Sequence, residues 1–274
     1  MAETIAAGGH PAGAAATVRP DRWWVGPLLT VLGLGGFVVY TTWAAFQGNH
    51  FYNGGYLSPL YSPVLFVDPA SAGAAPLAHA WFGTWPGWWP AFLPASPAFF
   101  ILVFPGAFRG TCYYYRKAYY RSFFGTPPGC AVNPVPRGAY RGETLLLLFQ
   151  NLHRYALYAA IVFIFILSYD ASMSFFRDGR FGVGVGSLVL TLNAVLLGAY
   201  TFGCHSFRHL IGGRMDCFSC DGSVGPRYGL WRRVSWLNAR HMQFAWLSLF
   251  WVGFTDFYIR MVSIGIIRDL NTWG

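Results

Sequence analysis

The stretch GCHSFRHLIGGRMDCFSC, Gly203 to Cys220, holds three of the five cysteines and two of the seven histidines of the chain. His205 and His209 stand four residues apart, a spacing that puts both on one helix face. Cys217 and Cys220 form a CxxC motif. Two thiolates and two imidazoles can hold zinc, or a Rieske-type [2Fe–2S] cluster with two cysteines on one iron and two histidines on the other. The charges flanking CxxC are typical of a solvated loop.

A second ligand set takes one residue from each of four apolar segments: Cys112, His153, Cys204 and His241. It also joins two thiolates to two imidazoles, so it could hold a Rieske-type cluster inside a helix bundle. A third arrangement places haem b between two facing histidines, such as His153 and His241. Each residue alone is explained equally well as a buried thiol or an interhelical polar contact. Their convergence from four segments favours a site, and the residues leave the three arrangements open.

The elements that must position these residues are membrane helices. Of the 274 residues, 55% are hydrophobic and only 11% charged, against about 25% charged in a soluble domain. Several apolar runs reach the roughly 20 residues that a helix needs to cross a bilayer. The sequence predicts an all-α polytopic membrane protein, with a flexible cytoplasmic tail over residues 1–22 and a membrane domain over residues 23–274. The tail lacks the basic start and apolar core of a signal peptide.

We expect a bundle of five transmembrane helices, over residues 25–46, 98–115, 145–169, 183–204 and 241–264. The second is the weakest, because Pro105, Arg109 and the basic residues after it interrupt the apolar run. Lys and Arg gather between the second and third helices and between the fourth and fifth, whereas none occurs from Gln47 to Pro97. Cytoplasmic loops carry the excess of Lys and Arg. We therefore expect a cytoplasmic N-terminus and a C-terminus outside. The net charge of +9 reflects these basic loops, so we expect no nucleic-acid partner.

This topology brings the four candidate ligands of the second set to a similar depth, near the cytoplasmic ends of four of the five helices. Ionisable side chains inside a membrane are costly and tend to mark function. Cysteines on the cytoplasmic side predict no structural disulfides. In the fifth helix, Asp256 and Arg260 are spaced to pair with each other near the outer face, which we interpret as structural.

Several runs together resemble one family: TCYYYRKAYYRSFF, NLHRY, GCHSFRHLIGG and LNARHMQFAW. From about Trp23 to the C-terminus, the chain is similar to the single-chain, five-helix membrane anchor (SdhC-type) of respiratory complex II, succinate dehydrogenase. It resembles most the class that lacks haem.

The resemblance implies a subunit of an enzyme with no succinate site in this chain. Such a subunit docks a flavoprotein and an iron–sulfur subunit on its cytoplasmic face and passes electrons from the latter to quinone, either menaquinone or ubiquinone. Its relay in the membrane is a Rieske-type [2Fe–2S] cluster rather than haem b. The preferred metal ligands are then Cys112, Cys204, His153 and His241. The resemblance also implies the cytoplasmic membrane of a bacterium, contact with lipids, and allows a higher oligomer of the complex.

Further residues follow from the resemblance and from their position at the inner side. Further candidate metal ligands are His205, His209 and Cys130. The two histidines are also candidate quinone-binding groups. Quinone reduction needs protons and polar groups near the carbonyl oxygens, and Arg154 and Arg208 are the nearest candidates.

The alternative function is a non-redox membrane scaffold or transporter-like protein. Its structural zinc would be bound by His205, His209, Cys217 and Cys220. Transporters commonly show internal repeats and interrupted helices at the bilayer midplane. The sequence shows no convincing repeat, which counts against a transporter.

Overall fold

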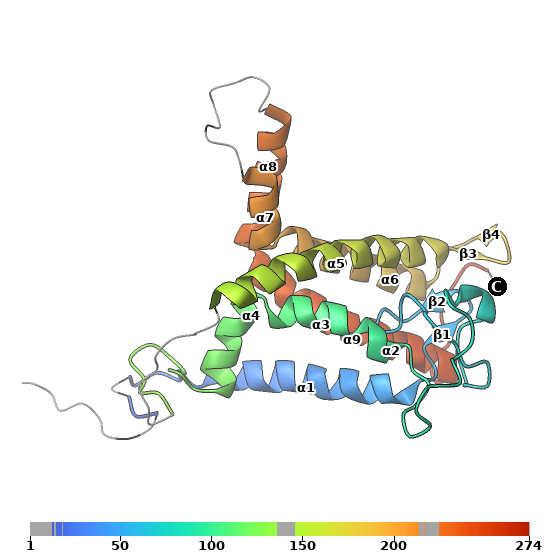
Figure 1. Ribbon diagram of the computed structural model, residues 1–274, viewed down its shortest axis with the longest axis horizontal. Coiled ribbons are helices and arrows are strands. Elements are labelled where there is room, and N and C mark those ends of the chain that lie inside the picture. The colour runs from blue at the N-terminus through green and yellow to red at the C-terminus, as the bar shows by residue number, and fades with distance from the viewer. Residues whose placement is uncertain are drawn as a thin grey trace, which may run out of the picture. The chain divides into compact units, whose positions relative to one another are not determined.

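The computed structural model describes residues 13, 15–17, 19–135, 146–213, 217 and 225–273. In this part of the chain the structure is mainly helical, with two short antiparallel hairpins (Figure 1). In chain order the elements are α1 (Val25–Gln47), β1 (Tyr52–Asn53), β2 (Tyr56–Leu57), η1 (Leu77–His79), α2 (Ala98–Ile101), α3 (Val103–Gly110), α4 (Tyr113–Ala118), the π-helical η2 (Tyr119–Phe123), α5 (Leu146–Met173), β3 (Phe176–Arg177), β4 (Arg180–Phe181), α6 (Val185–Phe202), α7 (His205–Gly212), α8 (Gly225–Ala239) and α9 (His241–Ile264). The all-α prediction is confirmed.

Four stretches of helix within the described residues are long and apolar enough to cross a membrane: Val25–Gln47, Asn151–Met173, Val185–Phe202 and His241–Ile264. Their outward faces expose large apolar side chains, among them Val39 at 71% and Phe165 at 68%. A soluble protein rarely exposes such continuous apolar surface, whereas lipid covers it without cost. These helices match four of the predicted spans.

The predicted second span, residues 98–115, differs from a single helix. The apolar helical stretch Ala98–Gly110 is shorter than the other four, about 20 Å at 1.5 Å per residue. A new helix begins after Cys112, whose backbone is extended (φ −63°, ψ 129°). A hydrocarbon core is roughly 30 Å thick, so the fifth crossing stays a prediction.

The chain divides into two compact units, and the predicted tail over residues 1–22 stays a prediction. The first unit contains Met1–Gly36 and Gly110–Gln150, the second Phe37–Arg109 and Asn151–Gly274. In the first unit, the Thr17 hydroxyl donates to the Ala131 carbonyl at 2.9 Å, and the Arg19 guanidinium donates to the Cys130 carbonyl at 3.0 Å. These bonds hold the segment before α1 against the loop that follows η2.

In the second unit, α6 packs along α9, and α5 lies beside α6 (Figure 1). Trp251 on α9 donates its indole N–H to the Val189 carbonyl of α6 at 3.1 Å. Buried Leu190, Ala194 and Ile259 belong to one core cluster between the elements. The apolar faces of the helices therefore meet each other as well as lipid.

The segment between α1 and α2 is folded around a buried cluster of its own. Phe51, Leu60, Tyr61 and Val64 are all buried in a cluster that includes Val252 of α9. This segment lacks basic residues, so it can fold as a largely apolar cap over its end of the bundle.

A buried ion pair on α9 forms hydrogen bonds with this cap. The predicted pairing of Asp256 with Arg260 is confirmed. Nε of Arg260 lies 3.5 Å from Oδ2 of Asp256. The Arg260 side chain is 2% exposed and the Asp256 side chain 0%. Asp256 also accepts hydrogen bonds from the hydroxyls of Tyr40 and Ser58, and Arg260 donates to the Asn49 carbonyl at 2.9 Å. Buried charges are costly unless paired and hydrogen-bonded, and these bonds supply partners from the cap.

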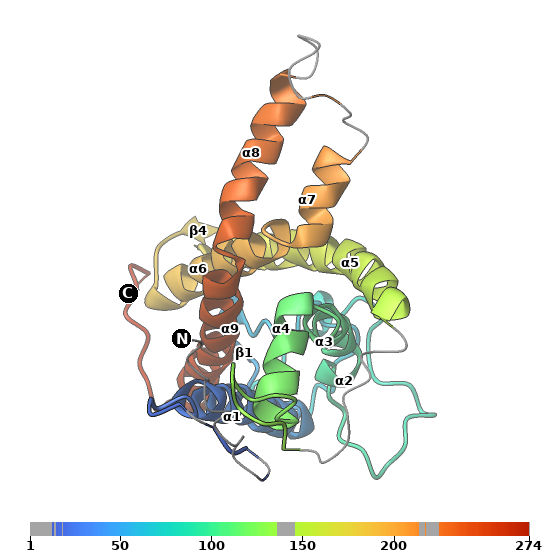
Figure 2. The same cartoon turned by 90° about the vertical axis from the view of Figure 1, so that its left-hand side faces the viewer.

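Helices α7 and α8 form a hairpin that projects sideways from the second unit, across the direction of α5, α6 and α9 (Figures 1 and 2). We call this hairpin the α7–α8 arm. Asn238 donates to the Gly203 carbonyl at 2.8 Å, and Arg208 of α7 donates to Ser235 of α8 at 3.0 Å. The arm therefore has contacts of its own that fix its two helices together.

Candidate functional site

Two predicted ligands, His153 of α5 and Cys204, meet in the second unit. Nε2 of His153 lies 3.0 Å from Sγ of Cys204. His153 is 7% exposed and Cys204 is 1% exposed, so the pair is shielded from solvent. Water exclusion strengthens the electrostatic interactions of both groups.

Cys204 reaches this position because α6 ends two residues earlier, at Phe202. A Cβ on Gly203 would lie 2.7 Å from the Ala199 carbonyl oxygen and 3.1 Å from that of Leu237, so the backbone passes where only glycine fits. Cys204 then adopts an extended conformation and caps α7, with Sγ accepting from the Ser206 N–H at 3.4 Å. The thiol is thus fixed by the junction between two helices.

Aromatic rings connect His153 with His241, the first residue of α9. Phe108 stacks on the His153 ring at 4.8 Å between ring centres, with 9° between planes. Tyr200 meets Phe108 edge-on at 5.4 Å and stacks on His241 at 4.8 Å. His153, Phe108, Tyr200 and His241 therefore form one continuous stack from α5 through α3 and α6 to α9.

Arg109 adds a positive charge to this stack, and the sequence reasoning assigned it no role. Its guanidinium lies 4.5 Å from the centre of the Tyr200 ring. It donates to the Ala245 carbonyl at 3.1 Å and to the Ser248 hydroxyl at 2.8 Å, both on α9. An arginine that interrupts an otherwise apolar helix was the available signal, since a charge at that depth needs a partner.

The other predicted metal ligands are distributed over both units. Cys112 belongs to the first unit, where it is buried before α4. Cys130, also in the first unit, is exposed. Among the residues that the structure describes, no group of three or more His, Cys, Asp or Glu side chains that could hold a metal ion is present. Of the four preferred ligands, His153 and Cys204 are in contact, and the ligand set as a whole stays a prediction.

The local set of the opening stretch is not assembled in the described residues either. His205 and His209 are exposed on α7. Cys217 is disulfide-bonded, which corrects the expectation of no disulfides and removes its thiolate as a ligand in this state. Cys220 lies outside the described residues.

The two predicted quinone-binding arginines lie in different surroundings. Arg154, next to His153, is exposed. Arg208 lies 4.8 Å from the centre of the Trp231 ring and donates to Ser235, so it contributes to the α7–α8 arm. Their quinone role stays a prediction.

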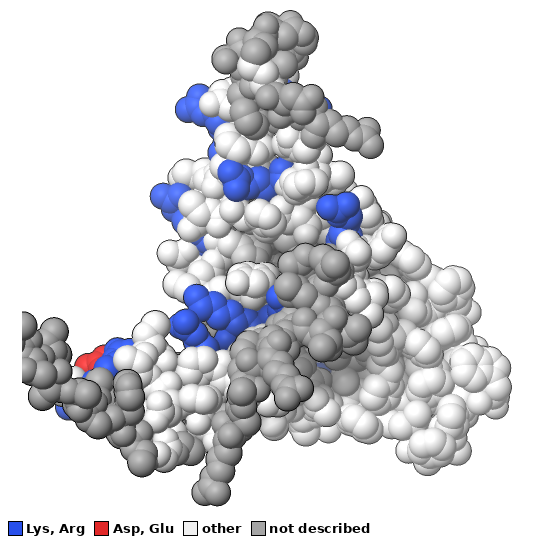
Figure 3. All heavy atoms as spheres, turned by 60° about the vertical axis from the view of Figure 1, so that its left-hand side comes forward, with Lys and Arg blue, Asp and Glu red and all other residues white. Residues whose placement is uncertain are grey.

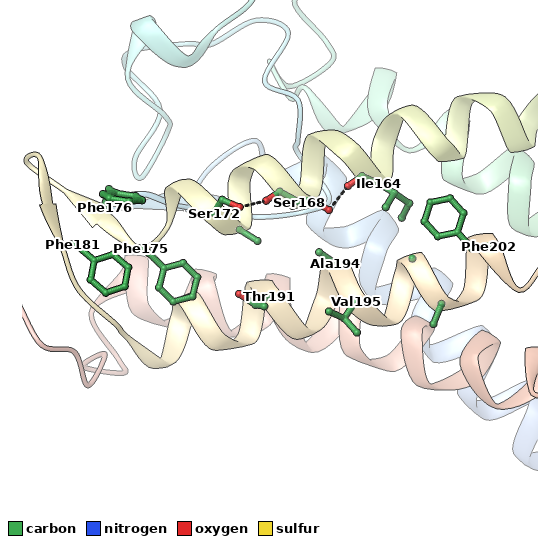
Figure 4. Close-up of a pocket in the computed structure, with 13 residues that line it drawn as sticks. Ile164, Ser168, Ser172, Phe175, Phe176, Phe181, Thr191, Ala194, Val195 and Phe202 are labelled. Atoms are coloured by element: carbon green, nitrogen blue, oxygen red, sulfur yellow. Dashed lines mark hydrogen bonds between the residues drawn. The ribbon is translucent and has the colours of Figure 1, made fainter. Parts of the chain in front are cut away.

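A groove of about 590 Å³ runs between α5 and α6 (Figure 4). Phe175, Phe176 and Phe181 line the end near the β3–β4 hairpin, and Phe202 lines the other end. The hydroxyl groups in its wall, such as those of Ser168 and Thr191, donate to backbone carbonyls of their own helices. The groove is therefore an apolar slot, and Phe202 at one end of it stands two residues before Cys204 in the sequence.

The fold and this site define a helical, multi-pass membrane subunit with buried thiol and imidazole groups at one end of its bundle. Residues 25–265 match the family model described as actinobacterial succinate dehydrogenase subunit SdhC. A chain of the Mycobacterium smegmatis Sdh1 complex in the apo form is 46% identical, with a TM-score of 0.82 and 94% of each chain covered. No curated protein sequence matches at a significant level.

The chain belongs to the actinobacterial SdhC family. It is the membrane subunit of a succinate dehydrogenase complex and a multi-pass protein of a bacterial cytoplasmic membrane. The predicted family, enzyme class and location are confirmed, and its partners include other subunits of that complex.

Proposed function

We propose that this membrane anchor passes electrons from the iron–sulfur subunit of the complex to quinone, and that it holds a Rieske-type [2Fe–2S] cluster at its inner end. The observation that carries the proposal is the buried contact of 3.0 Å between His153 and Cys204. Burying ionisable side chains in a membrane-embedded bundle is energetically costly, so a buried histidine and cysteine in contact indicate a binding role.

The donor set fits such a cluster in its chemistry. Thiolate sulfur and imidazole nitrogen are the ligands of Rieske-type centres, and the described pair supplies one of each. Cys112 and Cys204 would be the thiolate ligands, and His153 and His241 the imidazole ligands. When bound, the cluster supplies a one-electron carrier whose reduction potential is raised by its two imidazoles.

The residues around the pair support this role. Phe108 and Tyr200 cover the two imidazole rings and exclude water from them. The Arg109 guanidinium places a positive charge against Tyr200, and a nearby cation favours an added electron. We infer that Arg109 makes the site easier to reduce.

The α5–α6 groove suits the isoprenoid tail of a quinone. Its apolar wall and elongated form match an apolar chain, and Phe202 brings its inner end close in sequence to Cys204 (Figure 4). Arg154, exposed beside His153, is a candidate donor to a quinone carbonyl. Polar groups set at one end of an apolar site commonly fix the orientation of a ligand.

The positive-inside pattern supports the topology that this function needs. We propose that Ala98–Gly110, with its flanking residues, makes the fifth crossing, so that the N-terminus is cytoplasmic and the C-terminus outside. The basic segments after α3 and after α6 then lie in the cytoplasm. There they can face the flavoprotein and iron–sulfur subunits.

The ligand assignment is tested in the intact complex by two paired substitutions. His153→Ala with His241→Ala should abolish succinate-dependent quinone reduction while leaving reduction of a soluble dye by the flavoprotein unchanged. His205→Ala with His209→Ala should retain most quinone reduction. The reverse pattern would overturn the ligand assignment, and full activity in both variants would overturn the relay.

A further inference from the structure

The α7–α8 arm connects the ends of two membrane-spanning helices, so it lies at the level of a membrane surface. It leaves the bundle between Phe202, the last residue of one span, and His241, the first residue of another. Both residues therefore mark the end of a hydrocarbon-crossing segment. Figures 1 and 2 show the arm running across the direction of the spanning helices, that is, along the plane of the bilayer.

The arm also extends past the side of the bundle. Seen along the spanning helices in Figure 2, α7 and α8 reach outward from the ends of α6 and α9 instead of covering them. In a bilayer, the outer part of the arm would therefore lie over lipid. A partner docked over the centre of the bundle would leave this part of the arm uncovered.

Charge on the two helices of the arm has one sign, whereas the sequence between them contains Arg214, Asp216 and Asp221. Residues 203–213 and 225–240 contain no Asp or Glu but five arginines, namely Arg208, Arg227, Arg232, Arg233 and Arg240. Figure 3 shows Lys and Arg side chains at several heights along it. Arg232 and Arg233 are exposed, and no ion pair joins them to an acid in the described chain. Such a surface attracts anions.

Exposed aromatic and aliphatic side chains stand among these arginines. Trp236 is 54% exposed and Leu230 is 45% exposed. The Arg240 guanidinium lies 4.1 Å from the centre of the Trp236 ring, and Arg232 is four residues before that tryptophan, on the same helix face. Tryptophan with arginine is the combination found at the headgroup layer of membranes.

We propose that the α7–α8 arm is an interfacial anchor that lies in the headgroup layer and binds anionic phospholipids. Arg232, Arg233 and Arg240 bind the phosphate groups, and Trp236 and Leu230 enter the apolar boundary below them. A basic residue near an anionic surface strengthens attachment by about fivefold. The inference goes beyond the electron-transfer function and depends on the proposed topology only for naming the cytoplasmic leaflet.

The arm should keep its fold when these exposed charges are removed. Its helices are joined by the Arg208–Ser235 bond, by Arg227 donating to the Ile211 carbonyl at 2.7 Å, and by Val234, buried at 3% exposure. Neither Arg232 nor Arg233 takes part in these contacts. Their replacement therefore tests binding and not folding.

The experiment is native mass spectrometry of the intact, detergent-purified complex titrated with phosphatidylglycerol or phosphatidylcholine. Arg232→Gln with Arg233→Gln is compared with the control Arg180→Gln with Arg268→Gln, two exposed arginines at the opposite end of the second unit. We expect the arm variant to bind phosphatidylglycerol at least tenfold more weakly, with the control and all phosphatidylcholine binding unchanged. Equal phosphatidylglycerol binding by the two variants would overturn the proposal.

A second measurement separates lipid from an acidic protein partner. A spin label at Trp236→Cys, with the exposed Cys130 replaced by serine, should report headgroup depth in vesicles that contain phosphatidylglycerol. A label fully in water, or loss of the soluble subunits from the Arg232/Arg233 variant with unchanged lipid binding, would assign the arm to a protein partner instead.

Discussion

Nε2 of His153 lies 3.0 Å from Sγ of Cys204, although 51 residues separate them in the chain. The contact joins the N-terminal part of α5 to the point where α6 ends and α7 begins. Both groups are buried, and both belong to the ligand set that the sequence favoured. It is the geometric core of the proposed redox site.

Arg109 should influence the site without binding a metal. Arg109→Gln removes the charge beside Tyr200 and weakens the bonds to Ser248 and the Ala245 carbonyl. A hydrogen bond from a charged group contributes about 1.5–3 kcal/mol, so we expect a lower unfolding temperature and severalfold slower quinone reduction. Arg109→Lys should recover stability only in part, because an ammonium lacks the planar fork.

A structural role alone for Arg109 would change the unfolding temperature and leave the redox behaviour untouched. Potentiometric titration of the complex makes this distinction. We expect the midpoint potential of the redox centre in the membrane subunit to be lower in Arg109→Gln. An unchanged midpoint potential would limit Arg109 to packing.

The ion pair of Asp256 and Arg260 should dominate the stability of the end of the bundle that the cap covers. Asp256→Ala leaves the Arg260 guanidinium buried without its carboxylate, a change that costs about 3–5 kcal/mol. Asp256→Leu combined with Arg260→Met should regain most of this loss, because both charges leave together. Thermal unfolding in detergent measures the effect, and the exposed Asp178→Asn serves as a neutral control. A single variant as stable as the control would contradict the argument.

The α5–α6 groove should matter for long-tailed quinones only. Ala199→Leu places extra volume into the groove wall, so KM for a quinone with several isoprenoid units should rise about tenfold, which corresponds to 1.4 kcal/mol. A quinone without a tail should be reduced as before. Leu188→Phe, at a position on α6 that is exposed and outside the groove, is the matched control. Equal effects on both quinones would exclude the groove as a tail site.

Alkaline pH should loosen the contact of the cap with the C-terminal segment. Burial, reinforced by the hydrogen bond to Asp269, raises the pKa of Tyr56 to about 12, against about 10 in an unfolded chain. The neutral phenol is therefore favoured by folding. Its contribution is complete below pH about 10 and is lost as pH rises towards about 12. Tyr56→Phe should flatten this decline in unfolding temperature, and an identical decline in the variant would place its origin elsewhere.

Much of this architecture could be predicted from the sequence, because the signals were long and local. The apolar runs that became α1, α5, α6 and α9 are long and hold few charged residues, and the spacing of Asp256 and Arg260 predicted their pairing. The second span was less predictable, since Pro105 and Arg109 interrupt it and the helix that was expected to reach Tyr115 ends at Gly110.

The proximity of His153 and Cys204 could be predicted from the sequence, but the residues that surround them could not. His153 and Cys204 could be paired because topology brought them to one depth. Phe108 and Tyr200 could not, since their stacking depends on helix rotation, which apolar sequence leaves undetermined. The opening stretch also divided in two: Cys204 joined the buried site, whereas His205, His209 and Cys217 became parts of the arm and its connection.

The most direct test of the redox site is iron, acid-labile sulfide and EPR measurement on the intact complex, comparing the natural chain with Cys204→Ser and with Cys130→Ser. We expect Cys204→Ser to lose two irons, two sulfides and a reduced-state signal of low average g, while Cys130→Ser keeps all three. Unchanged iron and sulfide in Cys204→Ser, or zinc without sulfide in the natural chain's membrane subunit, would contradict the proposed cluster.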